Sequence, residues 1–340
     1  MGAWWSSDYQ CIPMESPQAI CDGYDLIRII QLANSSREGE DFVKASLVGE
    51  RVYALEAMFG EGGEDWVIVI YRYTSFRFCL TKKGEEDDEG AIILRPIRYQ
   101  CNYLVSSVDN SMEHVISRFA ELFDFGGASK VRFADPQRAI QDVSFPMLYE
   151  ATMMWINKDM VTKEELDFLA EHFKFINSMF SGAVVPPGYE AFMLRYPVVI
   201  LVNEGSLSAE DLLKTECEYL QVCNYQTTTT EINRFITYWL EHKLSETVQQ
   251  VHFKQCVNKQ DVFDGLGLLI WDPQRRGRYF RNTGKNARAM NAWEDRGRRE
   301  CSEYMDLVRD DGIVASVHYD EKDEECEFLV WKENSVRFKI

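Results

Sequence analysis

The side chains that most often hold metals are present, but they form no recognised ligand motif. The five histidines are scattered, and none lies four residues from another. The nine cysteines include no Cys-x-x-Cys pair, although zinc sites usually show such spacings. The sequence therefore predicts no metal and no cofactor. Cys217 and Cys223 flank a predicted strand, and we expect both to be buried thiols.

Nucleophilic and acid–base motifs are equally absent from the sequence. No Gly-x-Ser-x-Gly elbow and no phosphate-binding glycine loop occurs, and Gly265-Leu266-Gly267 is typical of a helix end. The adjacent carboxylates Asp310 and Asp311 lie in a predicted turn. His242 falls at the end of a predicted helix, and a favourable interaction with that terminus explains it without catalysis. We therefore expect a protein that is not an enzyme.

One basic stretch, residues 275–299, stands out in an acidic chain. Lys and Arg number 37 against 55 Asp and Glu, a net charge of −18, which excludes a general nucleic-acid binder. The stretch could bind phosphate or an acidic partner, or be a solvated loop that balances nearby acids. Its cations are Arg275, Arg276, Arg278, Arg281, Lys285, Arg288, Arg296, Arg298 and Arg299.

The composition is that of an ordinary globular protein with a sizeable core. Of the 340 residues, 46% are apolar and 27% charged. No apolar run approaches the length of a membrane span, so no membrane partner is expected. The first residues lack the charged and apolar regions of a signal peptide. We expect an intracellular protein, cytoplasmic or nuclear, with reduced thiols.

Hydrophobic periodicity in the first half predicts a helical segment and then a β-rich one. Leu26, Ile27 and Ile30 share one helical face within the first segment, residues 1–50. Residues 51–110 form the β-rich segment, with a hairpin of strands 66–71 and 76–80. The periodicity then predicts a helix over 111–123, a strand over 131–133 and a helix over 145–156.

The second half alternates strands with short helices whose starts are marked by capping residues. Thr162, Ser208 and Thr228 are the predicted helix starts, and the last helix carries one apolar stripe through Trp239. Strands are predicted over 198–202, 219–223, 248–253 and 328–331, a short helix over 261–266, and a type I′ hairpin at Asp311-Gly312.

The spacing of twenty to thirty residues between strand centres is that of stacked β–α units. We therefore predict an α/β fold of irregular stacked β–α units, like a short leucine-rich-repeat solenoid. A helical remnant precedes these units, and a β-hairpin closes the chain. The third predicted domain, residues 111–340, holds the units and the hairpin.

Three segments together resemble the type 2 F-box-associated domain, a family abundant in nematodes. A leucine pair, Leu212-Leu213, precedes a match to the family's "(D/E)-x-N-x-F-(L/I)-x-x-W", and a "D-(I/L)-x-R-x-D-G-x-x-A" segment follows near the end. The resemblance covers residues 111–335. Its motif residues, which we expect to be structural, are Leu212, Leu213, Asn233, Phe235, Trp239, Asp311 and Gly312.

The resemblance implies a substrate-recognition subunit of a cullin–RING ubiquitin ligase that performs no chemistry itself. Such proteins carry an N-terminal F-box that docks on a Skp-type adaptor, and the associated domain captures an as yet unknown protein substrate. Leu26, Ile27 and Ile30 match the second half of an F-box and are the candidate adaptor contacts. The stretch before Asp25 does not match the opening half, so the F-box is degenerate or truncated. The alternative is a stand-alone protein-interaction scaffold with no ligase role.

Overall fold

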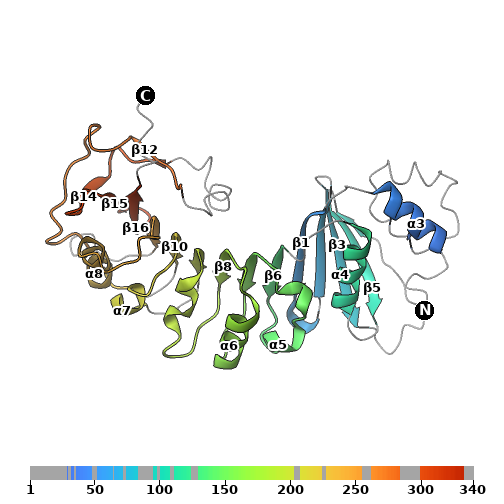
Figure 1. Ribbon diagram of the computed structural model, residues 1–340. Coiled ribbons are helices and arrows are strands. Elements are labelled where there is room, and N and C mark those ends of the chain that lie inside the picture. Colours follow the sequence, from blue (N-terminus) through green and yellow to red (C-terminus); the bar gives the residue numbers. More distant parts are fainter. Residues whose placement is uncertain are drawn as a thin grey trace. The chain divides into compact units, whose positions relative to one another are not determined.

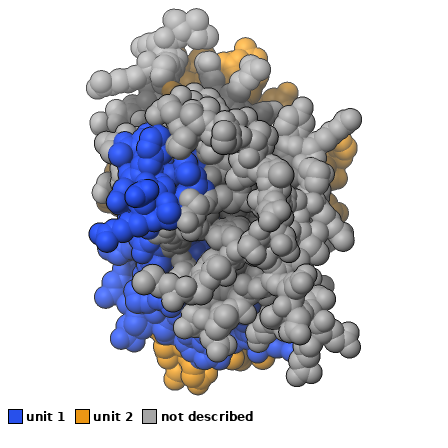
Figure 2. Space-filling model, turned by 90° about the vertical axis from the view of Figure 1, so that its right-hand side faces the viewer, with its two compact units in different colours: residues 1–155, 168–175 blue, residues 156–167, 176–340 orange. Residues whose placement is uncertain are grey.

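The computed structural model divides the chain into two compact units (Figure 1). Unit 1 comprises residues 1–155 and 168–175, and unit 2 comprises residues 156–167 and 176–340; they are blue and orange in Figure 2. The structure describes residues 29, 32–33, 36–47, 52–63, 65–71, 74–82, 95–97, 100–107, 111–123, 129–202, 207–223, 227–254, 262–283 and 299–332. Leu26, Ile27 and Ile30 lie outside these residues. No helix in the described ranges has the length and apolarity to cross a membrane.

The described part of unit 1 combines a mixed sheet with three α-helices and two short 3-10 turns. Its strand order is β6-β1-β2-β3-β5-β4, in which β1 pairs antiparallel with β2 and parallel with β6. The elements are α3 (Arg37–Ser46), β1 (Val52–Phe59), η1 (Glu61–Gly63), β2 (Asp65–Tyr71), β3 (Thr74–Lys82), β4 (Arg95–Ile97), β5 (Gln100–Ser107), α4 (Ser111–Leu122), β6 (Lys130–Phe133), α5 (Ile140–Val143) and η2 (Pro146–Leu148).

Strand β1 follows from a strict two-residue alternation that sequence reading overlooked. Leu55, Ala57 and Phe59 are buried, while the residues between them are half-buried. The rings of Phe59 and Phe133, on adjacent strands, stack with centroids 5.6 Å apart. The core of unit 1 therefore lies on this face of its sheet.

Unit 2 is built from short strands and helices in succession. Two elements, β7 (Met153–Ile156) and α6 (Lys163–His172), contribute residues to both units. The others are β8 (Ser178–Ser181), η3 (Glu190–Arg195), β9 (Val198–Leu201), α7 (Ala209–Leu212), β10 (Tyr219–Val222), α8 (Thr229–Leu240), β11 (Gln250–Phe253), β12 (Tyr279–Phe280), β13 (Arg299–Glu300), β14 (Met305–Val308), β15 (Val314–Asp320) and β16 (Glu325–Trp331).

The main sheet of unit 2 is parallel at one end and antiparallel at the other. Strands β8, β9, β10 and β11 pair in parallel in chain order. Strand β16 then pairs antiparallel with β11, and β15 and β14 extend the sheet. Helices α7 and α8 lie on one side of the parallel strands (Figure 1). The predicted mixed α/β class is confirmed.

The three predicted helix starts are confirmed, because their side chains cap the helices as expected. Thr228 accepts a hydrogen bond from the Glu231 backbone while Glu231 bonds back to the Thr228 backbone, a complete capping box. Ser208 and Asp211 do the same for α7. The apolar stripe of α8 is buried as predicted: Ile232, Phe235, Ile236 and Trp239.

The predicted helix over residues 145–156 is wrong. Pro146 begins a single 3-10 turn, and β7 follows. In β7, Met154 and Ile156 are buried while Met153 and Trp155 are only half-buried, so the period is two and not 3.6. The large side chains were compatible with a helix, but their alternation was the deciding signal.

Two predicted turn structures near the C-terminus also differ. Val262 is helical, but residues 263–266 form bends and turns in which Gly265 has positive φ, so the helix predicted over 261–266 does not extend past Val262. The hairpin between β14 and β15 has a three-residue loop in which Gly312 alone takes the left-handed conformation, at φ 83°. The Arg309 carbonyl accepts a hydrogen bond from the Gly312 N–H, and the Arg309 backbone N–H donates to the Ile313 carbonyl. Asp311 does not have positive φ, so the predicted type I′ turn is wrong.

Candidate functional site

Asn233 is a structural anchor on helix α8. Its side-chain amide donates to the carbonyls of Val262, at 2.9 Å, and Asp264, at 3.0 Å. These carbonyls belong to the turn that follows β11, so one side chain fixes that turn to the helix. The motif asparagine therefore positions the backbone of this segment against α8.

Phe235 and Trp239 carry the contact between α8 and the sheet. The Phe235 ring packs edge-on against Phe253 of β11 and Phe328 of β16, with centroids 5.8 and 5.6 Å away. Trp239 meets the same Phe328 at 5.4 Å. Of the motif leucines, Leu212 is fully buried. Phe235, Trp239 and Leu212 are core, whereas Leu213 is half-buried and lines the groove described below.

The second motif segment closes over the same core. The Arg309 guanidinium lies 5.0 Å from the centre of the Trp239 ring and bonds the Asp311 carboxylate at 2.6 Å. Hydrogen bonds from Arg309 lower the pKa of Asp311 to about 2, so its carboxylate is ionised at neutral pH. Gly312 supplies the left-handed residue that returns the chain into β15.

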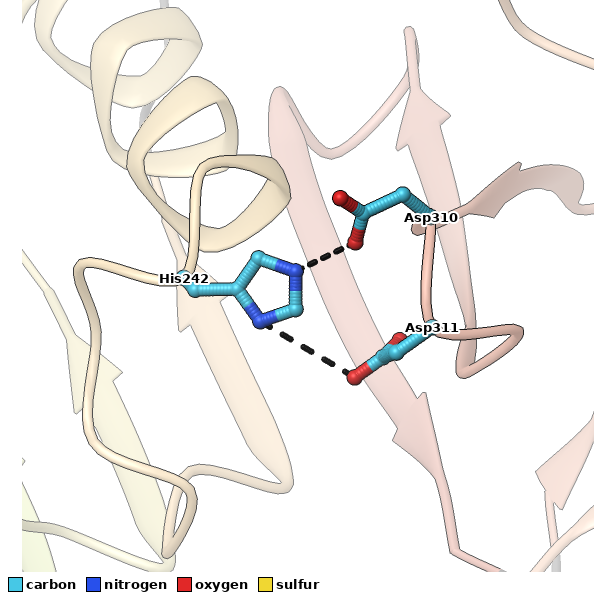
Figure 3. A group of neighbouring side chains, drawn as sticks. All are labelled: His242, Asp310 and Asp311. Atoms are coloured by element: carbon cyan, nitrogen blue, oxygen red, sulfur yellow. Dashed lines mark hydrogen bonds and ion pairs between the residues drawn. The ribbon is translucent and has the colours of Figure 1, made fainter.

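His242 meets both turn carboxylates (Figure 3). It follows α8 with φ 59°, its Nε2 contacts Asp310, and its Nδ1 lies 3.9 Å from Asp311. Candidate ligand atoms of the three lie within 4.8 Å of one another. However, a histidine coordinates an ion through one nitrogen, whereas this ring turns a different nitrogen to each carboxylate, and Arg309 already bonds Asp311. The cluster is therefore a polar contact between the end of α8 and the β14–β15 hairpin.

The basic stretch begins inside the protein and not on its surface. Arg276 is 1% exposed and donates from Nε to the buried Asp306 at 2.6 Å, and Arg275 bonds the same carboxylate at 2.9 Å. Ser316 also donates to Asp306, at 3.0 Å. Two of the nine cations are thus structural. Residues 284–298 lie outside the described part of the chain.

A groove crosses the amino ends of parallel strands in unit 2. It encloses about 660 Å³ and is open to solvent. The loops that enter β8, β9, β10 and β11 each contribute to it. Its lining residues are Asn177, Arg195, Pro197, Leu213, Lys214, Thr215, Glu216, Glu218, Ser245 and Thr247.

Charged side chains of both signs line this groove. The exposed Arg195 guanidinium stacks on the Phe192 ring, 3.7 Å from its centre. The Lys214 Nζ atom lies 3.3 Å from the Asp211 Oδ1 atom. Burial raises the pKa of Asp211, but hydrogen bonds from Ser208 and Lys214 outweigh this effect, so the pKa of Asp211 is lower than usual. Glu216 is exposed. Arg195 and Glu216 have no ion-pair partner among the described residues.

Sequence reasoning did not single out the groove residues, apart from Leu213. Arg195 is the last residue of the 3-10 turn η3, and Thr215 and Glu216 lie in a loop; none of the three belongs to a motif or a periodic pattern. Only the strand order brings these loops together, because each precedes a neighbouring parallel strand. A cation and a carboxylate twenty-one positions apart carry no spacing signal that a sequence alone reveals.

The comparisons with known proteins place this groove in a family context. Residues 190–251 match the family model described as F-box associated, and these residues hold the whole groove lining except Asn177. No curated protein matches the chain, and no solved structure does. The match to the F-box associated family covers η3, β9, α7, β10, α8 and the start of β11.

Proposed function

We propose that the chain is a substrate-recognition subunit of a cullin–RING ubiquitin ligase, in which unit 2 captures the protein to be ubiquitinated. The observation that carries the proposal is the coincidence of the F-box associated match, residues 190–251, with the groove. The motif residues around Trp239 are core, so the family signature maintains the fold. Recognition is left to the loop residues at the groove.

The chemistry of the described side chains supports binding and not catalysis. Burial raises the pKa of the Cys217 thiol well above its ordinary value, so that thiol stays protonated and unreactive. Asp306 is held by two arginines, and the His242 ring by two carboxylates. A family of non-catalytic, substrate-binding domains agrees with such a site.

A stand-alone interaction scaffold is the second candidate. It is favoured by the family match being confined to residues 190–251 and by the stretch before Asp25, which does not match the opening half of an F-box. In this version unit 2 still binds a protein, but no Skp-type adaptor joins it.

Proximity labelling separates the two candidates. The full chain and a version that lacks residues 1–50 are each fused to a labelling enzyme and compared in the same cells. The ligase proposal expects the adaptor to be labelled only by the full chain and a shared set of other proteins to be labelled by both. A shared set without any adaptor supports the scaffold, and the absence of any specific set contradicts both.

A further inference from the structure

The groove runs across neighbouring strand ends, and this direction defines what fits it. Adjacent strands are about 4.8 Å apart, so the four loops of the groove span on the order of 14 Å. An extended peptide rises about 3.3 Å per residue, and four or five residues cover that distance. A short extended segment of another protein therefore matches the groove in length.

The two unpaired charges belong to adjacent loops. The Glu216 backbone N–H donates to the Leu194 carbonyl at 2.9 Å, and the Cys217 thiol donates to the same carbonyl at 3.0 Å. The Arg195 and Glu216 backbones are thus neighbours, yet their side chains do not form an ion pair. Arg195 is instead held by its stacking on Phe192. A fixed cation and a carboxylate therefore remain available side by side.

The other acid that lines the groove, Glu218, already has a cation nearby. Burial lowers the pKa of Lys332, while the charges of Glu218 and Glu246 act on it in the opposite direction. Glu218 thus has the Lys332 cation nearby, and Lys214 is paired with the Asp211 carboxylate. Arg195 and Glu216 are left as the pair that a ligand would satisfy.

A buried hydroxyl adds a third recognition element. Thr215 lines the groove, is 1% exposed, and its Oγ1 makes no hydrogen bond within the described structure. A buried polar atom without a partner is unfavourable, and a ligand amide or carbonyl that reaches it would remove this cost. The residue lies between Lys214 and Glu216 in the same loop.

We propose that this groove binds an extended peptide segment that carries an acidic and a basic side chain two residues apart. Residues at this spacing point to the same side of an extended chain, about 6.6 Å apart, as adjacent loops require. The acidic side chain pairs with Arg195 and the basic side chain with Glu216. This inference rests on the proposed function, because it names the kind of substrate segment that unit 2 recognises.

The test uses the purified full chain and defined peptide pools. Each peptide has about nine residues, enough to overhang the groove at both ends. One pool fixes glutamate and lysine two residues apart, one fixes lysine and glutamate in the reverse order, and one fixes glutamine at both positions. All other positions hold uncharged residues. Fluorescence anisotropy measures each affinity.

Charge reversal provides the matched variants. The charged pools are expected to bind the natural chain at least about tenfold more tightly than the glutamine pool, the size of a charge-assisted bond. Arg195→Glu and Glu216→Lys should each abolish that preference, and the double variant should restore it. Lys322→Glu, the same charge change at an exposed turn outside the groove, should bind like the natural chain.

Equal affinity for all three pools, or an unchanged preference in Arg195→Glu, would overturn the inference. The adaptor labelling described above does not depend on these residues, so its result is independent. If the adaptor and shared partners are labelled while the peptide pools do not differ, the ligand assignment is wrong and the proposed function stands.

Discussion

The Arg309 guanidinium lies over the Trp239 ring, 5.0 Å from its centre, although seventy positions separate the two residues in the sequence. Arg309 reaches this position from the β14–β15 hairpin, while Trp239 belongs to α8. Its other contact, the Asp311 carboxylate, keeps the guanidinium paired although it is nearly buried. The two sequence motifs, around Trp239 and around Arg309, therefore meet in one structural junction.

The first prediction concerns Trp239, which is 3% exposed. Trp239→Ala should destabilise the protein by about 3–5 kcal/mol, because it leaves a cavity against Phe328 and removes the partner of Arg309. Thr237→Ala, on the half-buried side of the same helix, should cost about 1 kcal/mol or less. Urea denaturation measures both, and equal midpoints would contradict the assignment of the helix face.

The second prediction concerns the buried ion pair of Arg276 and Asp306. Arg276→Met should cost about 3 kcal/mol or more, because a fully buried carboxylate loses its closest cation. Arg278→Met removes an exposed pair with Glu300 and should leave the free energy of unfolding nearly unchanged. Chemical denaturation of the two variants gives the comparison. A loss as small for Arg276→Met as for Arg278→Met would show that the first arginine is not structural.

The third prediction concerns His252, which is buried on strand β11. Burial lowers the pKa of His252 well below 6.5, and the positive charges of Arg299 and Lys254 lower it further. The Glu327 carboxylate also lies next to His252, but it is shared with Arg299 and Tyr304. As the pH falls, His252 is therefore protonated in the unfolded chain before it is protonated in the folded protein. The free energy of unfolding consequently decreases as the pH drops below about 6.5.

His252→Gln is the matched variant for that loss. Between about pH 7 and pH 5.5, the melting temperature of this variant should fall less than that of the natural chain. The expectation concerns this difference in slope and not the melting temperature at pH 7. Melting curves across this range supply the measurement. Parallel pH profiles for the variant and the natural chain would exclude a contribution from His252.

Sequence reading recovered the elements whose signals are local. The capping residues Thr228 and Ser208 and the apolar stripe of α8 each lie within one or two helical turns, and all are confirmed. The strand β7 was mistaken for a helix, because bulky residues such as Trp155 fit either period over so short a stretch.

The site residues were hidden for a different reason. The contacts of Arg276 with Asp306 and of His242 with Asp310 join residues thirty or more positions apart. The sequence predicts that the basic stretch is a loop, either solvated or bound to phosphate or an acidic partner, yet Arg276 is core. Such pairings follow from strand order, which the sequence pattern does not specify.

The fourth prediction concerns the adaptor. In the proposed ligase subunit, Leu26, Ile27 and Ile30 would supply only part of the adaptor-binding surface, since the stretch before Asp25 does not match the opening half of an F-box. Losing several interface anchors at about 1–2 kcal/mol each turns a nanomolar contact into a micromolar one or worse. Calorimetry should therefore find weak or no binding of purified adaptor, and a complete F-box placed ahead of Asp25 should restore it. An affinity below about 100 nM for the chain as it stands would contradict this prediction.

The most direct test of the central claim, that unit 2 recognises another protein through its groove, is quantitative proximity labelling by the full chain and its groove variant. Arg195→Glu should lose a defined set of labelled proteins that Lys322→Glu retains, at equal expression and melting temperature. An identical set of labelled proteins for Arg195→Glu and the natural chain would contradict the account.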